Sequence, residues 1–497
     1  MRRFLSLIST VLPTCALLAA VPAAAAPGDL DTTFGSGFGK VMTAIGGTDD
    51  QGYAVALQPD GKIVIAGHCG PLPTRYEFCL ARYQADGTLD TSFGTGGKVI
   101  SPIGSSDDQA YAIALQPDGK IVIAGRCWNV GGYNFCLARY LANGALDLSF
   151  GTGGKVFSHV GSSFDFGYAI ALQPDGKIIV AGDCLGASSI TFCLARYQGG
   201  GTLDTSFGTG GTVSSPIGSG YASGRATVLQ PDGKIVVAGD CDIGLHIVFC
   251  LARYQAGGAL DPSFGSGGAV ISPIGSSTDH ATAIALQPDG KIVVAGYCAG
   301  ASNLDFCLAR YQANGILDSS FGTGGKVISP IGSADDQGYA IALQPDGKIV
   351  VAGFCRGTSN DDFCLARYQA NGTLDLSFGT GGTVISPIGS HEDHASTIAL
   401  QPDGKIVVAG ACYNSGWSFC LARYQGGPFG YRNCTMDIDG DGVVLATTDA
   451  LLLARTSLGM TGSAVINGIS FASHATRKTW PDIRNYLVTQ CGMALAP

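Results

Sequence analysis

Short apolar stretches and tight polar turns alternate along most of the chain, and the alternation is periodic. The string Gln-Pro-Asp-Gly-Lys starts seven times, at intervals of 57 or 58 residues, at Gln58, Gln116, Gln173, Gln230, Gln287, Gln344 and Gln401. In the first copy, the apolar segment Tyr53–Leu57 precedes this turn and Lys62–Ala66 follows it. Proline presets the backbone of the turn and glycine accepts a positive φ, so the pattern predicts a hairpin.

Two further segments, Phe78–Tyr83 and Lys98–Ser101, complete the repeat and are joined by a glycine-rich link. We name the four predicted strands a, b, c and d in chain order. Four short strands in a repeat of about 40–60 residues are typical of a β-propeller blade. A helical solenoid would show a period of ~3.6 residues, which these segments lack.

The two ends of the repeat region predict a closed ring. The seventh copy ends after its c strand, Phe419–Tyr424, whereas Gly39–Ile45 is an orphan d strand at the amino terminus. Seven a–b–c sets and seven d strands make seven blades, and closure removes the open sheet edge. The predicted fold class is therefore all-β, a seven-bladed β-propeller over residues 27–428 closed by the N-terminal strand. An open right-handed β-solenoid is the alternative.

An arginine recurs in every c strand, and an aspartate recurs in every link between c and d. We predict an ion pair in each blade, at Arg82–Asp90, Arg139–Asp147, Arg196–Asp204, Arg253–Asp261, Arg310–Asp318, Arg367–Asp375 and, across the closure, Arg423–Asp31. Solvated charges without a fixed partner are the alternative. Seven identical copies indicate architecture, because a single active site would break the symmetry.

The cysteines follow the same repeat. One pair in each copy joins the end of strand b to the start of strand c, within bridging distance at one hairpin. We predict disulfides at Cys69–Cys79, Cys127–Cys136, Cys184–Cys193, Cys241–Cys250, Cys298–Cys307, Cys355–Cys364 and Cys412–Cys420, with an eighth at Cys434–Cys491. Metal binding is the alternative, but the spacing is far from Cys-x-x-Cys.

The loops differ between the two faces of the predicted propeller. The a–b turns and c–d links barely change between copies, whereas the b–c loops differ every time and the d–a loops are acidic. We call these the constant face and the variable face. Recognition usually resides in variable loops on a rigid scaffold, so we expect ligand contacts at Trp128, Tyr133, Tyr413, Trp417, Asp107, Asp108, Asp335 and Asp336. Neutral drift of the loops is the alternative.

Residues 1–26 are predicted to be a secretory signal peptide. A basic start at Arg2 and Arg3 precedes the apolar run Phe4–Ala20 and small residues up to Ala26. A retained anchor and a lipoprotein at Cys15 are the alternatives. No later segment reaches the ~18 apolar residues that span a bilayer. We expect a protein that is secreted, periplasmic or on the cell surface, where disulfides persist.

Composition and charge narrow the function classes. Glycine contributes 75 of 497 residues and charged residues 13%, while 46% are hydrophobic, so the chain is not a disordered one. The net charge of −9 argues against a nucleic-acid partner. His391-Glu392-Asp393-His394 lacks the zincin spacing, and the chain has no Gly-x-Ser-x-Gly elbow or phosphate loop. An enzyme is not indicated, although an active site dispersed over several blades would leave no such motif.

The pattern changes after the last repeat, and residues 429–497 form a separate predicted module. The run Asp437-Ile-Asp439-Gly-Asp441-Gly matches the start of a calcium loop, in which three carboxylates and the carbonyl of Val443 converge on one cation. The closing acid is expected where Thr448 stands but is Asp449, one residue later. We predict calcium as the cofactor and helices over 449–458 and 481–489; a plain Asp/Gly turn is the alternative.

Two resemblances follow from these motifs. The unit with Gln-Pro-Asp-Gly-Lys-Ile-Val-x-Ala-Gly and Leu-Asp-x-Ser-Phe-Gly-x-Gly-Gly resembles the delta-60 repeat family of exported bacterial β-propellers, which implies the fold but no defined activity. The segment 437–458 looks like the first half of a type I dockerin, a calcium-binding module that docks onto cohesins of polysaccharide-degrading complexes. The match covers one loop and one helix, and a second aspartate-rich loop is missing.

Three hypotheses for function follow. The leading one is a non-catalytic, monomeric, exported propeller that binds a protein or glycan ligand through its variable face. Its C-terminal module would then serve calcium-dependent attachment or docking, with a cohesin-like partner as the candidate. The second is a carbohydrate-active enzyme or accessory protein of polysaccharide breakdown, and the third is a purely structural surface protein.

Overall fold

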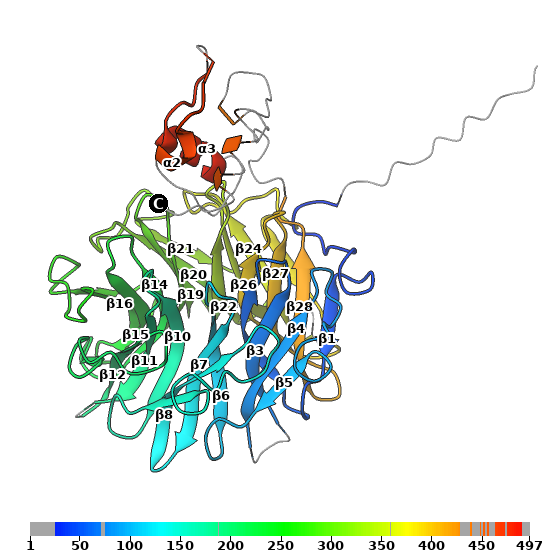
Figure 1. Ribbon diagram of the computed structural model, residues 1–497. Helices are drawn as coiled ribbons and strands as arrows, with labels where there is room; N and C mark the ends of the chain where they lie inside the picture. The colour runs from blue at the N-terminus through cyan, green and yellow to red at the C-terminus, as the bar shows by residue number, and fades with distance from the viewer. Residues whose placement is uncertain are drawn as a thin grey trace, which may run out of the picture.

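The computed structural model describes residues 25–427 except 71–74, 187 and 358, and beyond them residues 438–439, 448, 451–452, 455–456, 463–472 and 475–489. In this part of the chain, β1 to β28 form seven four-stranded antiparallel sheets arranged as the blades of a propeller (Figure 1). The predicted seven-bladed, all-β fold is confirmed.

Each blade runs from strand a near the central axis to strand d at the outer edge. The a strands are β2 (Gln51–Leu57), β6 (Asp108–Leu115), β10 (Asp165–Leu172), β14 (Ala222–Leu229), β18 (Asp279–Leu286), β22 (Asp336–Leu343) and β26 (Asp393–Leu400). The b strands are β3 (Ile63–Cys69), β7 (Ile121–Asn129), β11 (Ile178–Leu185), β15 (Ile235–Asp242), β19 (Ile292–Ala299), β23 (Ile349–Arg356) and β27 (Ile406–Tyr413).

The outer strands are as regular as the inner ones. The c strands are β4 (Glu77–Tyr83), β8 (Gly132–Tyr140), β12 (Ile190–Tyr197), β16 (Ile247–Tyr254), β20 (Leu304–Tyr311), β24 (Asp361–Tyr368) and β28 (Trp417–Tyr424). The d strands are β5 (Lys98–Ser101), β9 (Lys155–Ser158), β13 (Thr212–Ser215), β17 (Ala269–Ser272), β21 (Lys326–Ser329), β25 (Thr383–Ser386) and β1 (Lys40–Thr43). We number the blades 1 to 7 by their a strands.

The N-terminal strand closes the ring. β1 pairs antiparallel with β28, from Lys40 opposite Ala422 to Thr43 opposite Phe419, and completes the sheet β1-β28-β27-β26 (Figure 1). The ring therefore joins the first and last strands of the chain within one blade. This pairing excludes the open solenoid and leaves no blade with three strands.

The seven hairpin turns follow from their sequence. Gly61 of the first Pro-Asp-Gly turn has a φ of 84°, and the six equivalent glycines have φ values between 82° and 93°. Backbone in this region favours glycine, because a Cβ atom would clash. The repeated turn residues thus fix the same hairpin register seven times.

The hydrophobic cores lie between neighbouring blades and not within single ones. In one core, Val64 and Leu80 of blade 1 pack with Ile121, Ile123 and Ala138 of blade 2, all fully buried. An equivalent core joins Ile63 and Ile65 of blade 1 to Val407 and Leu421 of blade 7, so the cores also form a closed ring. Each blade is buried on both faces, which explains why its b and c strands are almost continuously apolar.

The predicted Arg–Asp pairs are confirmed in all seven blades. In blade 5, Arg310 Nε lies 2.8 Å from Asp318 Oδ2, and the guanidinium stacks over Phe321 at 4.6 Å. The same guanidinium donates to the carbonyl of Ala370 in the next blade. Across the closure, Arg423 Nε lies 2.7 Å from Asp31 Oδ2. Each arginine therefore bonds its own c–d link and joins its blade to the next.

Seven of the predicted disulfides are present, Cys69–Cys79, Cys127–Cys136, Cys184–Cys193, Cys241–Cys250, Cys298–Cys307, Cys355–Cys364 and Cys412–Cys420. Each bridges the ends of strands b and c beneath the variable b–c loop. Their number is consistent with an oxidising, extracellular location. The eighth predicted pair, Cys434–Cys491, lies outside the described residues.

The described C-terminal residues include two short helices, α2 (Ser463–Ile466) and α3 (Trp480–Thr489). They share a small core in which Val465 meets Ile483 and Leu487. The predicted helix over 481–489 is confirmed by α3, whereas the one over 449–458 lies mostly outside the described residues. Among the described residues, no helix is long and apolar enough to cross a membrane.

Candidate functional site

A β-bulge occurs at the same position of every a strand and faces the central channel. The pairing of β2 with β3 shifts register between Gly52 and Ala54, so that Tyr53 has no partner in the ladder. The equivalent residues of the other blades are Tyr111, Tyr168, Arg225, Thr282, Tyr339 and Ser396. Bulges re-aim side chains and are common beside functional sites. Seven bulges thus form a ring of side chains in the channel, which we call the bulge ring.

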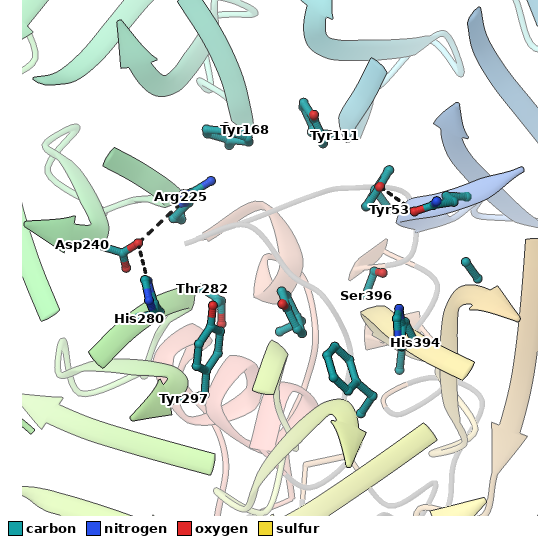
Figure 2. A pocket seen from close by; sticks show the side chains of 15 residues that line it. Tyr53, Tyr111, Tyr168, Arg225, Asp240, His280, Thr282, Tyr297, His394 and Ser396 are labelled. Atoms are coloured by element: carbon teal, nitrogen blue, oxygen red, sulfur yellow. Dashed lines mark hydrogen bonds and ion pairs between the residues drawn. The ribbon is translucent and has the colours of Figure 1, made fainter. Parts of the chain in front are cut away.

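The bulge ring forms the floor of a cavity of about 500 Å³ at the mouth of the channel on the variable face. A second cavity of about 260 Å³ continues below the ring between the a strands. The first cavity is also lined by Asp240, Tyr297 and Phe354 from b strands, and by Gln51, His280 and His394 from the starts of a strands. Figure 2 shows these side chains gathered around the opening from blades on all sides.

Aromatic rings cover two arcs of this cavity. Tyr53, Tyr111 and Tyr168 follow one another with ring centroids 5.3 and 5.0 Å apart. In the second arc, the centroids of Tyr339 and Phe354 are 5.6 Å apart, and Phe354 stacks on His394 at 4.3 Å. Rings packed against one another are held rigidly, so the cavity offers preformed apolar surfaces to a ligand.

A polar cluster of blades 4 and 5 separates the two arcs. Asp240 Oδ2 lies 2.9 Å from His280 Nδ1 and 3.7 Å from Arg225 Nε (Figure 2). The other oxygen of Asp240 accepts the backbone N–H of Ala281 at 2.8 Å. The guanidinium of Arg225 stacks over Tyr168 at 4.5 Å. Buried Asp240 therefore fixes the orientation of both an imidazole and a guanidinium that line the cavity.

A second buried carboxylate, Asp183 of blade 3, lies beside this cluster. Its Oδ2 accepts a hydrogen bond of 2.6 Å from the hydroxyl of Ser223. Burial raises the pKa of Asp183 to about 6, although the Ser223 hydroxyl and the charge of Arg225 oppose the shift. Such a group exchanges its proton near neutral pH, as the acids and bases of active sites do.

Two of the expected ligand contacts, Asp108 and Asp336, lie below the variable face. Both side chains are fully buried at the first position of an a strand. Asp336 accepts the backbone N–H groups of Ile331 and Gly332, and Asp108 those of Ile103 and Gly104. Their carboxylates thus hold the d–a loops in place, and similarly bonded aspartates stand in blades 1, 3, 5 and 7.

The neighbouring acids, Asp107 and Asp335, lie higher on the variable face but also have partners in the protein. Asp107 Oδ2 accepts the hydroxyl of Tyr133 at 2.5 Å, and Asp335 Oδ1 accepts the backbone N–H of Leu304 at 2.9 Å. The acidic d–a loops therefore brace b–c loops, Asp107 that of the blade it leads into and Asp335 that of the blade it leaves. A ligand contact at Asp107, Tyr133 or Asp335 stays a prediction.

The two tryptophans of the variable face differ in their relation to the cavity. Trp417 packs against Tyr413 at 5.6 Å and against the cavity residue His394 at 5.2 Å. Trp128 packs against Tyr133 at 5.1 Å, and neither of these two residues lines the cavity. The structure therefore brings Trp417 and Tyr413 close to the cavity and leaves Trp128 in a separate aromatic cluster.

The predicted calcium ligands are mostly outside the described residues, where Asp437, Asp441, Val443 and Asp449 all fall. Asp439 is described and fully buried, and its backbone carbonyl accepts the N–H of Arg477 at 2.9 Å. Within the described part of the chain, no group of three or more histidine, cysteine, aspartate or glutamate side chains is placed to hold a metal ion. Calcium binding stays a prediction.

The bulge ring and the Arg225–Asp240–His280 cluster were not predicted from the sequence. Their signal was present in the repeat itself. When the copies are aligned, the position of Tyr53 changes among tyrosine, arginine, threonine and serine, although glycine or alanine always precedes it and alanine or threonine always follows it. The position of Asp240 is even more diverse and holds His68, Arg126, Asp183, Tyr297, Phe354 and Ala411 in the other copies. Variability inside strands, and not only in loops, marks the site.

Comparison with solved structures finds other propellers at low identity. Sqt1 from Chaetomium thermophilum is 13% identical, with 78% of this chain and 89% of that chain covered and a TM-score of 0.39. The polysaccharide lyase Uly1 is 12% identical, with 75% and 90% covered and a TM-score of 0.41. Aldose sugar dehydrogenase from Streptomyces coelicolor, in its PQQ-bound form, is 15% identical, with 65% and 96% covered and a TM-score of 0.35. Likenesses of this size carry no information about ligand or reaction.

No curated protein matches the chain. A family described as "Domain of unknown function (DUF5122) beta-propeller" matches it seven times, at residues 58–93, 116–150, 173–207, 230–264, 287–321, 344–378 and 401–426. Each match begins at a Gln-Pro-Asp-Gly-Lys turn, and the first six end in or next to the Ser-Phe-Gly of the c–d link. The resemblance to a propeller repeat family is thereby confirmed, whereas nothing in the comparisons bears on a dockerin. The chain is a seven-bladed propeller, and each of its seven repeats matches this β-propeller family.

Proposed function

We propose that this protein is an exported carbohydrate-binding propeller whose site is the cavity at the channel mouth. The observation that carries the proposal is the loss of sevenfold symmetry at the bulge ring, where Arg225, Thr282 and Ser396 replace the tyrosines of the other four blades. Residues that hold the fold together recur in every blade, whereas a single asymmetric ligand needs different contacts on its different sides. The ligand site is therefore expected where equivalent positions carry different side chains.

The size and chemistry of the cavity favour a glycan over a protein ligand. A volume of about 500 Å³ is in the range of small-molecule sites, whereas protein interfaces are broad and nearly flat. The C–H faces of a sugar ring pack on aromatic side chains, and its hydroxyls bond to planar polar groups. The cavity offers both, in the aromatic arcs and in Gln51, Arg225 and His280.

A glycan array followed by titration calorimetry tests this function. We expect the full-length mature protein to bind a subset of glycans, and Tyr339→Ala to weaken that binding about tenfold, because a lost aromatic contact amounts to ~0.5–1.5 kcal/mol beyond the area it buries. Trp128→Ala is the matched control, since it removes an aromatic side chain from the same face but outside the cavity. Absence of binding to every glycan on the array would reject the proposal.

A carbohydrate-active enzyme is the second candidate. It is favoured by the buried carboxylate of Asp183, which is bonded to Ser223 behind the cavity wall beside Arg225 and whose pKa burial raises to about 6. Catalysis needs groups that gain or lose a proton near working pH, and His280 is held by Asp240 in the way a catalytic histidine is oriented. Incubation of the bound polysaccharide with the protein separates the two functions. Product formation that Asp183→Asn abolishes would establish an enzyme, and binding without turnover would establish a lectin-like module.

For the C-terminal residues we propose a calcium-stabilised module for attachment or docking. The support is the sequence of the loop, with Asp437, Asp439 and Asp441 at alternate positions, and the complete burial of Asp439. Burial of a carboxylate is costly unless a cation or other partners compensate it. A cohesin-like protein or a cell-surface polymer is the proposed partner, and the protein is proposed to act as a monomer.

Titration of the full mature chain with calcium tests this module. We expect heat of binding and a rise in thermal stability, both lost in the double variant Asp437→Asn/Asp439→Asn. Asp232→Asn, in an exposed Pro-Asp-Gly turn of the propeller, is the control. The idea fails if the wild-type protein shows neither heat nor a thermal shift.

Export through the N-terminal segment is likewise a proposal, supported by its sequence and by the seven disulfides. Sequencing of the protein recovered outside the cytoplasm should give a mature chain that starts at Ala26, within one residue of the predicted end of the signal, because Pro27 is a poor residue directly after a cleavage site.

A further inference from the structure

A hydrogen-bond donor and an acceptor stand side by side on one wall of the cavity without a partner in the described part of the chain. Arg225 donates to Tyr221 through Nη2 and faces Asp240 through Nε, which leaves its Nη1 unengaged. His280 donates to the carboxylate of Asp240 through Nδ1, and in this tautomer its Nε2 is an acceptor. Both side chains line the cavity, and Figure 2 shows them on the same side of the opening.

The carboxylate behind them cannot itself serve a ligand. Asp240 is 1% exposed, and its oxygens are occupied by His280, Arg225 and the backbone N–H of Ala281. It therefore acts as an anchor that fixes a guanidinium and an imidazole from two different blades. The ring of Tyr168, which stacks against the guanidinium of Arg225, restricts the position of this guanidinium further. A donor and an acceptor held in this way are preorganised for one ligand orientation.

We propose that the site selects an acidic sugar residue, whose carboxylate is bound by Arg225 while a neighbouring hydroxyl donates to His280 Nε2 and its ring lies against the aromatic arcs. The proposal rests on the proposed carbohydrate function and names its ligand class. Arginine is the side chain that binds carboxylates in a planar, bidentate manner, and the charge-assisted bonds are about twice as strong as neutral ones. A neutral hydroxyl in place of the carboxylate would use the guanidinium of Arg225 only in part.

The charges around the cluster predict how binding depends on pH. The groups that face His280 and Arg225 are Tyr168 on β10, Asp183 on β11, Tyr221 before β14, Asp240 on β15 and Tyr297 on β19. Tyr111 on β6, Tyr339 on β22 and Asp165 on β10 also act on Arg225 or Asp183. Asp240 balances Arg225, so the sign of the cluster depends on Asp183, whose pKa burial raises to about 6. A bound carboxylate favours a neutral Asp183. Affinity for an acidic sugar should therefore rise as pH falls from 7 to 5.

The experiment uses an array of acidic glycans, each paired with its carboxyl-reduced form, and the full-length mature protein. We expect binding of carboxylated glycans at least about tenfold tighter than binding of the reduced forms, the difference that one charge-assisted contact supplies. Arg225→Gln should remove this preference, so that the acidic and the reduced forms bind with similar affinity. Arg225→Lys, which keeps the charge but not the planar fork, should retain part of it and guards against a folding defect in the glutamine variant.

Arg126→Gln is the matched control. Arg126 also stacks on aromatic rings of the variable face, Tyr133 and Phe166, and pairs with Asp107, but it does not line the cavity. Equal binding of acidic and reduced glycans, a preference for sulfated over carboxylated ones, or an affinity that does not increase at pH 5 would overturn the inference while leaving the carbohydrate function standing. No binding to any glycan would overturn both.

Discussion

The two ends of each blade differ in how far their residues repeat from blade to blade. Toward the constant face, every blade carries an arginine, an aspartate and a phenylalanine in the same contact, from Arg82–Asp90 over Phe93 to Arg423–Asp31 over Phe34. Toward the variable face, the bulge ring holds four tyrosines, an arginine, a threonine and a serine at equivalent positions. Repetition marks the groups that join the blades, and divergence on an identical backbone marks the groups that are free to recognise a ligand.

The largest expected effect comes from removing one repeated contact. Arg310→Leu should lower the free energy of unfolding by about 3 kcal/mol, because it leaves Asp318 as a buried carboxylate without its partner. Arg126→Leu, at the variable face and partly exposed, should cost less than about 1 kcal/mol. Urea unfolding of the oxidised proteins measures both. Similar losses of unfolding free energy in the two variants would contradict the proposal that the two ends of the blades have different roles.

The disulfides should come next. Replacing Cys298 and Cys307 by alanine opens a loop of 9 residues, and the chain-entropy estimate gives a loss of about 2–3 kcal/mol. The same replacement at Cys241 and Cys250, with the same loop length, should give the same loss. Thermal unfolding of the two variants therefore tests whether equivalent disulfides stabilise their blades equally, even though they lie beneath different b–c loops. Clearly different losses of stability would show that each b–c loop makes its own contribution.

The pH dependence of stability should also distinguish the two ends. Near the variable face, burial raises the pKa of Asp336 to about 6. The stability it contributes is complete below its unfolded pKa of ~3.9 and is lost as pH rises through about 6. Near the constant face, the Ser206 hydroxyl, assisted by Arg196, holds the pKa of Asp204 below its ordinary value. Its contribution is present above ~3.9 and is lost as pH falls further.

Stability should therefore be greatest between about pH 4 and 6, where both contributions are present. The free energy of unfolding should increase between pH 7 and pH 5, and Asp336→Asn should reduce this increase by about 1 kcal/mol, since one pKa unit corresponds to ~1.4 kcal/mol. Asp204→Asn should instead weaken the loss below pH 4. Thermal unfolding across this pH range gives both slopes, and a maximum above pH 7 would contradict the assignment.

The smallest effect concerns the tryptophans, and it appears in ligand binding. Trp417→Ala should weaken glycan binding about threefold, because the side chain supports His394 at the cavity wall and one such ring contact amounts to ~0.5–1.5 kcal/mol. Trp128→Ala should leave the affinity unchanged, so the double variant should resemble Trp417→Ala alone. Calorimetry with a glycan from the array decides this. A larger loss for Trp128→Ala would place ligand contacts on the loops, outside the channel mouth.

The constant half of the molecule could be read from the sequence almost completely. The repeat period, the Pro-Asp-Gly turns and the orphan d strand predicted seven blades and their closure, and both are confirmed. The same holds for the Arg–Asp pairs and for seven disulfides. These features are local in sequence or recur in every repeat. A structure correctly predicted for one repeat therefore holds for all seven.

The candidate site was predictable only in its location on the variable face. Asp108 and Asp336 were taken for surface acids, but the a strand begins at these residues and turns each carboxylate inward toward the backbone of its own loop. Conversely, Arg225 and His280 stand 55 residues apart in the sequence, and no motif links them. Only the ring geometry brings them to one buried carboxylate.

The sequence by itself determined the number of blades, their four-stranded order, the hairpin turns and the covalent bridges, because backbone sterics and short-range pairing decide all of these. The tertiary structure alone decided which side chains meet in the channel. Closure of seven sheets around one axis, with a bulge in every innermost strand, brings residues from all blades to one cavity. The sequence contains each of those residues, but only the closed ring of blades brings their side chains together.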